Sequence, residues 1–96
     1  MEEKLKILIE KCVDILDAES INEVWHFYNH DEYEMALEGL LIELTSAEKY
    51  PSNYDFKQLN ELVTYYDLKN EAIFDVNIWE KYVCWRKNSS TSMHNN

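Results

Sequence analysis

Residues 33–44 read YEMALEGLLIEL and carry the clearest structural pattern of the chain. Its apolar side chains fall at i, i+3, i+4, i+7, i+8 and i+11, which is the spacing of one face of a helix. They are Tyr33, Ala36, Leu37, Leu40, Leu41 and Leu44. The helix should end before Pro51, because the residue before a proline avoids helical backbone angles. A glycine inside a helix, such as Gly39, lowers helix stability by about 1 kcal/mol relative to alanine. The simplest reason to tolerate this cost is a close approach of a neighbouring helix at Gly39.

Helical periodicity extends on both sides of this segment. A first amphipathic helix is predicted over residues 2–17 and a second over 20–29, the latter opened by a capping box of Ser20 and Glu23. Beyond Pro51, a second capping box of Ser52 and Asp55 predicts a fourth helix that continues to Tyr66.

The last apolar segment runs from residue 70 to residue 87 and is compatible with more than one secondary structure. Ile73, Phe74 and Val76 join the later apolar residues in a pattern that suggests a fifth helix, which Asn70 or Asp75 could cap. The letters YVCW within it would also suit a strand. We therefore expect an all-α fold, a single compact bundle of four to five helices over residues 1–87. Residues 88–96 should form a disordered tail.

Composition narrows the class of partner. The 96 residues include one glycine and one proline, which disfavours tight hairpins and glycine-rich nucleotide loops. The net charge of -10 argues against nucleic acid and anionic membranes, because both are bound through Lys and Arg. A cationic protein is the natural complement.

Motifs for catalysis are not found. Cys12 and Cys84 both lie in apolar surroundings, and we expect each to be a buried, reduced thiol.

The N-terminus has no apolar signal core and no stretch suits a membrane span, so a cytoplasmic protein is expected. We predict no enzymatic activity, no small-molecule substrate and no cofactor.

The negative charge is concentrated in one part of the chain. Residues 12–48 contain no Lys or Arg but hold ten carboxylates. The rest of the chain has nine acidic and nine basic residues, because 19 − 10 = 9. One interpretation is a solvated face that keeps the protein soluble. The other is a docking surface for a basic protein, since aromatic side chains lie beside the carboxylates.

The docking interpretation predicts the contact residues. They are Glu23, Trp25, Tyr28, Asp31, Glu32, Tyr33, Glu34, Glu38 and Glu43. Glu34 and Glu38 should be like-charged neighbours on one helix face, so replacing both by Lys should preserve stability and weaken binding.

A possible metal site competes for some of these residues. His26, His30, Glu34 and Glu38 recur every four positions and would share a face of one unbroken helix. The polar cluster over residues 29–31 is more typical of a turn or a new helix cap, which would separate them. We therefore predict no metal site.

Residues 23–44, EVWHFYNHDEYEMALEGLLIEL, carry a resemblance. This segment is similar to the small acidic helical immunity proteins of bacterial polymorphic toxin and contact-dependent growth inhibition systems, of the MafI-like type. Those chains share a central E-Y-E-x-A-x-E-x-L-L helix, matched here from Glu32 or Glu34 around Tyr33 to Leu40 and Leu41. The resemblance implies a cytoplasmic protein that binds and blocks one toxin domain, often a nuclease. An adaptor or regulatory module for another basic protein is the alternative.

Overall fold

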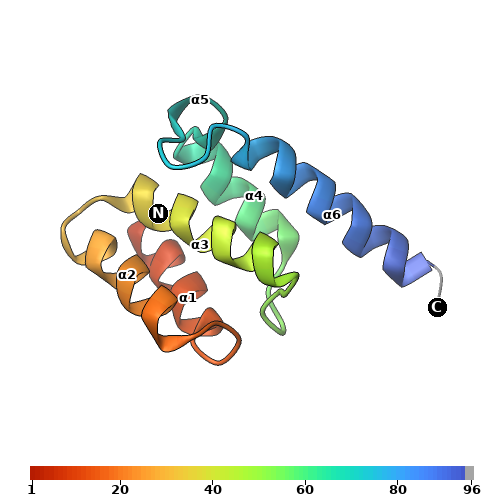
Figure 1. Cartoon of the computed structure of the whole chain (residues 1–96), viewed down its shortest axis with the longest axis horizontal. Coiled ribbons are helices and arrows are strands. Elements are labelled where there is room, and N and C mark those ends of the chain that lie inside the picture. The colour runs from red at the N-terminus through yellow and green to blue at the C-terminus, as the bar shows by residue number, and fades with distance from the viewer. Residues whose placement is uncertain (95–96) are drawn as a thin grey trace.

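The computed structural model describes residues 1–94, with residues 86 and 88–94 described as backbone only. All regular secondary structure in this part of the chain is helical, which confirms the predicted all-α class (Figure 1). The prediction of four to five helices is wrong by a small margin, because residues 1–94 form six. They are α1 (Glu2–Cys12), α2 (Ala18–Asn29), α3 (Tyr33–Ala47), α4 (Phe56–Tyr65), α5 (Leu68–Glu71) and α6 (Ile78–His94).

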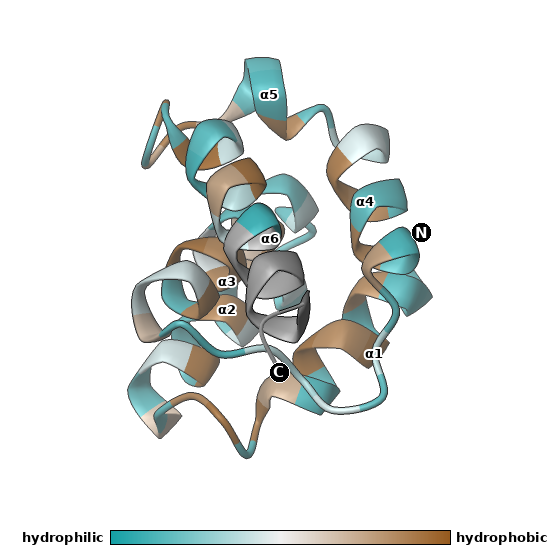
Figure 2. Ribbon diagram, turned by 90° about the vertical axis from the view of Figure 1, so that its right-hand side faces the viewer, coloured by the Kyte–Doolittle hydropathy of each residue, from teal (hydrophilic) through white to brown (hydrophobic). Residues whose placement is uncertain are grey.

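Helix α3 lies at the centre of the bundle, in contact with α1, α2, α5 and α6. Its predicted apolar stripe is confirmed, since Ala36, Leu37, Leu40, Leu41 and Leu44 are all buried. Hydrophobic segments of α1 and α4 also face the interior of the bundle (Figure 2). Burial of this stripe, worth roughly 1.5–3 kcal/mol for each large side chain, holds the other helices around α3.

The surrounding helices each bury one narrow face. The buried residues are Leu5, Leu8, Ile9 and Cys12 in α1; Ile21 and Val24 in α2; Leu59, Leu62 and Val63 in α4; Leu68 in α5; and Ile78, Tyr82 and Trp85 in α6. Cys12 is buried, as predicted. Burial raises the pKa of its thiol to about 12. The same prediction for Cys84 is wrong, because its position on α6 directs it to solvent.

Two aspartates, rather than the predicted capping boxes, start α2 and α4. Asp17 Oδ1 accepts a hydrogen bond of 2.7 Å from the Ser20 amide, and this bond lowers the pKa of Asp17. Asp55 Oδ1 accepts one of 2.9 Å from the Lys57 amide. Since Asp17 takes an extended conformation as the cap of α2, the chain must leave α1 before it. The first helix accordingly ends at Cys12, short of the predicted residue 17.

Helix α2 ends where the sequence predicts a turn. The Glu32 amide donates to Phe27 O at 2.9 Å and the Asp31 amide to Tyr28 O at 3.1 Å. Asp31 has the left-handed conformation that this terminating motif requires, with φ of 60°. Helix α3 likewise ends at Ala47, before Pro51 as predicted.

The predicted fifth helix is in fact two helices, α5 and α6, separated by residues 72–77. Residues 82–85, which could have formed a strand, belong to α6. This helix continues to His94, into the range predicted as a tail, because no glycine or proline stops it. Residues 95–96 of that predicted tail lie outside the described residues. Within the described part, no helix combines the length and apolar content needed to cross a bilayer.

Gly39 tests how closely α2 approaches α3. A Cβ added at Gly39 would lie 4.0 Å from Val24 Cγ2, an ordinary van der Waals contact, so close helix packing does not require a glycine here. We predict that Gly39→Ala raises the free energy of unfolding by roughly 0.5–1 kcal/mol, measured by urea denaturation. Ala36→Gly, at a buried position of the same helix, is the reverse control and should lower it. A less stable Gly39→Ala protein would show that α2 and α3 are closer than described.

Candidate functional site

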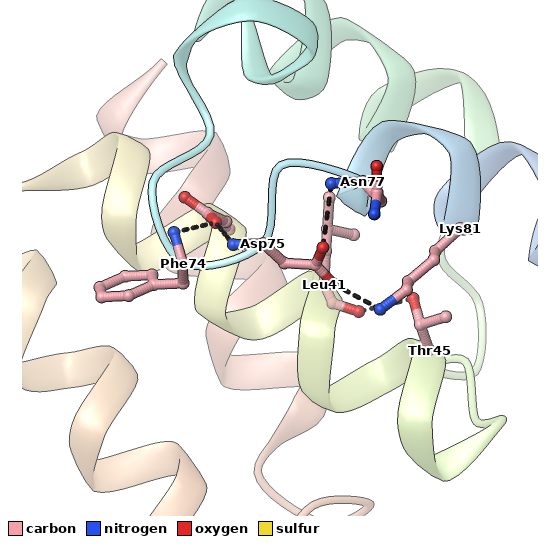
Figure 3. Close-up of polar contacts among 7 residues, drawn as sticks. Leu41, Thr45, Phe74, Asp75, Asn77 and Lys81 are labelled. Atoms are coloured by element: carbon pink, nitrogen blue, oxygen red, sulfur yellow. Dashed lines mark hydrogen bonds and ion pairs between the residues drawn. The ribbon is translucent and has the colours of Figure 1, made fainter.

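Glu38 is the one buried charged residue among those described, with 1% of its surface exposed. Its carboxylate accepts three backbone hydrogen bonds: from Ile73 N at 2.7 Å to Oε1, and from Phe74 N at 2.6 Å and Asp75 N at 2.8 Å to Oε2. The dashed lines at Phe74 and Asp75 in Figure 3 mark the latter two. Glu38 is therefore buried beneath residues 73–75, rather than exposed as one of the predicted contact residues, and reversing its charge would disrupt the fold.

A second carboxylate secures the other end of this loop. Asp75 Oδ1 accepts a hydrogen bond of 2.9 Å from the Asn77 amide, and Oδ2 pairs with Lys81 Nζ at 2.6 Å (Figure 3). The Lys81 bond, followed by the Asn77 bond, lowers the pKa of Asp75. The loop backbone is thus held to α3 by Glu38 and to the start of α6 by Asp75.

The loop presents apolar side chains to water. Ile73, Phe74 and Val76 are 62%, 49% and 76% exposed, although the sequence pattern placed them on a helix. The Phe74 ring lies beside that of Phe27, with the two centroids 5.4 Å apart. We call residues 73–76 the apolar loop. Sequence periodicity could not reveal this loop, because the Glu38 carboxylate that binds its backbone amides lies far away in the sequence.

A groove between α2 and α3 lies on the Phe74 side of the apolar loop. It has a cavity volume of about 210 Å³. Its lining consists of Ser20, Glu23, Val24, Phe27, Gly39, Ile42, Glu43 and Phe74. Ser20 Oγ donates a hydrogen bond of 3.0 Å to Glu43 Oε2, so this carboxylate is positioned within the groove. Two predicted contact residues, Glu23 and Glu43, therefore line the same groove, and most of its other lining residues are apolar.

A second hollow lies at the turn between α2 and α3, on the Ile73 side of the loop. It measures about 260 Å³ and is lined by Asp31, Glu32, Tyr33, Glu34, Met35, Tyr66 and Ile73. Tyr33 and Tyr66 also line an adjoining hollow of about 500 Å³, together with Met1, Glu2, Glu3, Lys4 and Tyr65. We call the carboxylates Glu2, Glu3, Asp31, Glu32 and Glu34, with the tyrosines Tyr33, Tyr65 and Tyr66, the acidic surface.

Two tyrosines of this surface, Tyr33 and Tyr66, have raised pKa values. A hydrogen bond of 2.9 Å from the Tyr33 hydroxyl to Asp31 Oδ1, with desolvation and the charges of Asp31 and Glu2, raises the pKa of Tyr33 to about 12. Desolvation first, then neighbouring Tyr65 and acidic groups that include Glu2, raise the pKa of Tyr66 to about 12. Both phenols thus remain neutral hydrogen-bonding groups near pH 7.

The remaining predicted contact residues lie beside this surface. The Tyr28 hydroxyl donates to Glu2 O at 3.2 Å, and its ring packs edge-on against Tyr33 with centroids 5.1 Å apart. Trp25 also packs edge-on against Tyr28, with ring centroids 5.5 Å apart. The structure therefore gathers the aromatic and acidic residues near the α2–α3 turn, keeps Glu23 and Glu43 in the groove, and withdraws Glu38 into the interior.

His26, His30, Glu34 and Glu38 do not share one helix, because the chain turns where the sequence predicts a turn. Helix α2 ends at Asn29, so His26 and Glu34 belong to different helices. His30 Nδ1 instead lies 2.8 Å from His26 O, within hydrogen-bonding distance. Among the side chains described, no group of three or more His, Cys, Asp or Glu residues is arranged to hold a metal ion.

The Glu38 anchor can be tested by a single amide substitution. Glu38→Gln should lower the free energy of unfolding by about 2–3 kcal/mol, because an amide loses charge-assisted bonds and turns an NH₂ toward amide donors. Hydrogen exchange should also accelerate at the amides of residues 73–75. Glu34→Gln, one turn earlier and exposed, is the matched control and should stay within about 0.5 kcal/mol of the native protein. Equal stability of both variants would contradict the anchoring role.

Comparison of this chain with models of protein families, with characterised proteins and with solved structures gives no match.

Proposed function

We propose that the protein is an immunity protein that binds a basic toxin domain, such as a nuclease, and neutralises it through the acidic surface. The observation that carries the proposal is the gathering of carboxylates around tyrosine-lined hollows at the α2–α3 turn. One lysine, Lys4, borders them, and its ammonium group already pairs with Glu61 at 3.3 Å. The surface therefore keeps an excess of negative charge for a cationic partner.

Electrostatics explains why such a surface suits an inhibitor of a nuclease. A domain that binds nucleic acid does so through Lys and Arg at phosphates, so a carboxylate-rich surface can occupy the same positions. While it is bound, nucleic acid is both displaced and repelled. Opposite charges also raise association rates to about 10⁸–10⁹ M⁻¹s⁻¹ at low salt, against roughly 10⁵–10⁶ M⁻¹s⁻¹ for neutral pairs. Fast association favours capture of the toxin before it acts.

The tyrosines supply the contact chemistry that charges alone lack. Tyr65 is 63% exposed and stands edge-on to Tyr66, with ring centroids 4.9 Å apart. Rigid rings with a neutral hydroxyl bury apolar area and form hydrogen bonds at little entropic cost, which is why tyrosine is enriched at interfaces. Their faces also attract Lys and Arg cations. Carboxylates and tyrosines together match a basic partner.

Charge reversal tests the proposal directly. Glu32→Lys with Glu34→Lys changes two exposed carboxylates of the acidic surface. We expect an adjacent reading frame to encode the toxin domain, and affinity for that domain should fall at least about tenfold at low salt, mainly through slower association. Surface plasmon resonance over a range of salt concentrations measures this, and cells producing the toxin domain should lose protection.

The matched control is Asp14→Lys with Glu80→Lys, which changes the net charge equally at exposed positions outside the acidic surface. It should retain most of the affinity. An equal loss in both double variants would mean that net charge, rather than the acidic surface, drives binding, and no loss in either would mean that the carboxylates only keep the protein soluble. Binding to the native protein by a basic partner without toxic activity would favour an adaptor, and no binding by the toxin domain would refute the proposal.

A further inference from the structure

We propose that the apolar loop, residues 73–76, is the apolar centre of the partner-binding surface and inserts into an apolar depression on the basic toxin domain. The inference rests on the proposed function and adds the element that would dominate the contact. Ile73 and Val76 are among the most exposed large apolar side chains described. Exposure of such groups is unfavourable in the free protein, and their burial would favour a complex.

The position of the loop places it between acid-lined hollows. Ile73 lines the hollow that contains Asp31, Glu32 and Glu34. Phe74 lines the groove that contains Glu23 and Glu43. An apolar centre with charged groups around it is the usual anatomy of a specific interface. The complementary partner therefore has an apolar depression bordered by Lys and Arg.

The loop is also fixed before any partner arrives. Glu38 binds the amides of residues 73, 74 and 75, and Asp75 binds Asn77 and Lys81 beyond them. A loop that is already ordered loses little conformational entropy on association, which increases affinity. The hydrogen bonds act on backbone amides, so the side chains of Ile73 and Val76 remain available for contact.

The charge around the loop favours a basic protein over a second copy of the same chain. Two copies would bring like-charged carboxylates together, at a net charge of -10 each, and such surfaces repel. A cationic domain instead gains attraction at the rim and burial at the centre. The two contributions differ in salt dependence, because screening weakens the charge pairs and leaves the apolar contact.

The loop is tested with Ile73→Ser and Val76→Ser in one variant. Both residues are exposed, so stability should be unchanged. The dissociation rate from the toxin domain of the adjacent reading frame should rise at least about tenfold, with the salt dependence of association preserved. Ile7→Ser on α1 with Val13→Ser directly after it, at 48% and 47% exposure, is the matched control and should bind as the native protein does.

A second variant separates the anchor from the contact. Glu38→Gln keeps the amino acids of the loop unchanged but weakens the hydrogen bonds that hold its backbone. Affinity should therefore fall, and amide exchange at residues 73–75 should become faster. Native affinity in the Ser variant, alongside weaker binding after charge reversal at Glu32 and Glu34, would overturn the loop proposal and leave the proposed function standing. No binding of the toxin domain by the native protein would overturn both. A native dimer that the Ser variant abolishes, with toxin affinity unchanged, would assign the loop to self-association instead.

Discussion

The carboxylate of Glu38 joins the middle of the central helix to a loop that follows α5, and the last third of the chain depends on this contact. Moving a carboxylate out of water costs several kcal/mol unless hydrogen bonds replace its hydration. Three backbone amides within 2.8 Å of Glu38 provide that replacement. Because those amides point at Glu38, residues 73–75 cannot continue a helix. The chain therefore turns, and α6 starts afresh at Ile78 and packs against α3.

The acidic segment, residues 12–48, contains two kinds of carboxylate. Asp17 caps α2, Glu38 holds the loop and Glu43 accepts a bond from Ser20, so these groups serve the fold. Glu32 and Glu34 remain exposed at the α2–α3 turn. A run of acidic residues in a sequence thus has no single explanation. Of the ten carboxylates in residues 12–48, Glu38 is buried and Glu43 is half-buried, whereas the other eight are exposed.

Local patterns predicted the parts of the fold that local forces determine. The stripe of α3 and the turn after Asn29 follow from apolar spacing and polar clustering, and both are confirmed. Helix ends were harder to place, because left-handed conformations fall at Asp31, Glu48, Asn53 and Asp67, whereas the single glycine lies inside α3. The apolar loop could not be predicted at all. Ile73 and Phe74 satisfy helical spacing, but their amides bind a carboxylate more than thirty residues away in the sequence.

That long-range contact also determines how the proposed interface would operate. Glu34 lies in the first turn of α3, with Asp31 and Glu32 directly before it, and the apolar loop is attached to the same helix through Glu38. The distance between the two parts is therefore fixed by α3 itself. A partner drawn in by the carboxylates meets the apolar side chains already in register, so attraction and burial act in one step. Charge would then govern how quickly the complex forms, and the buried apolar area would govern how long it lasts.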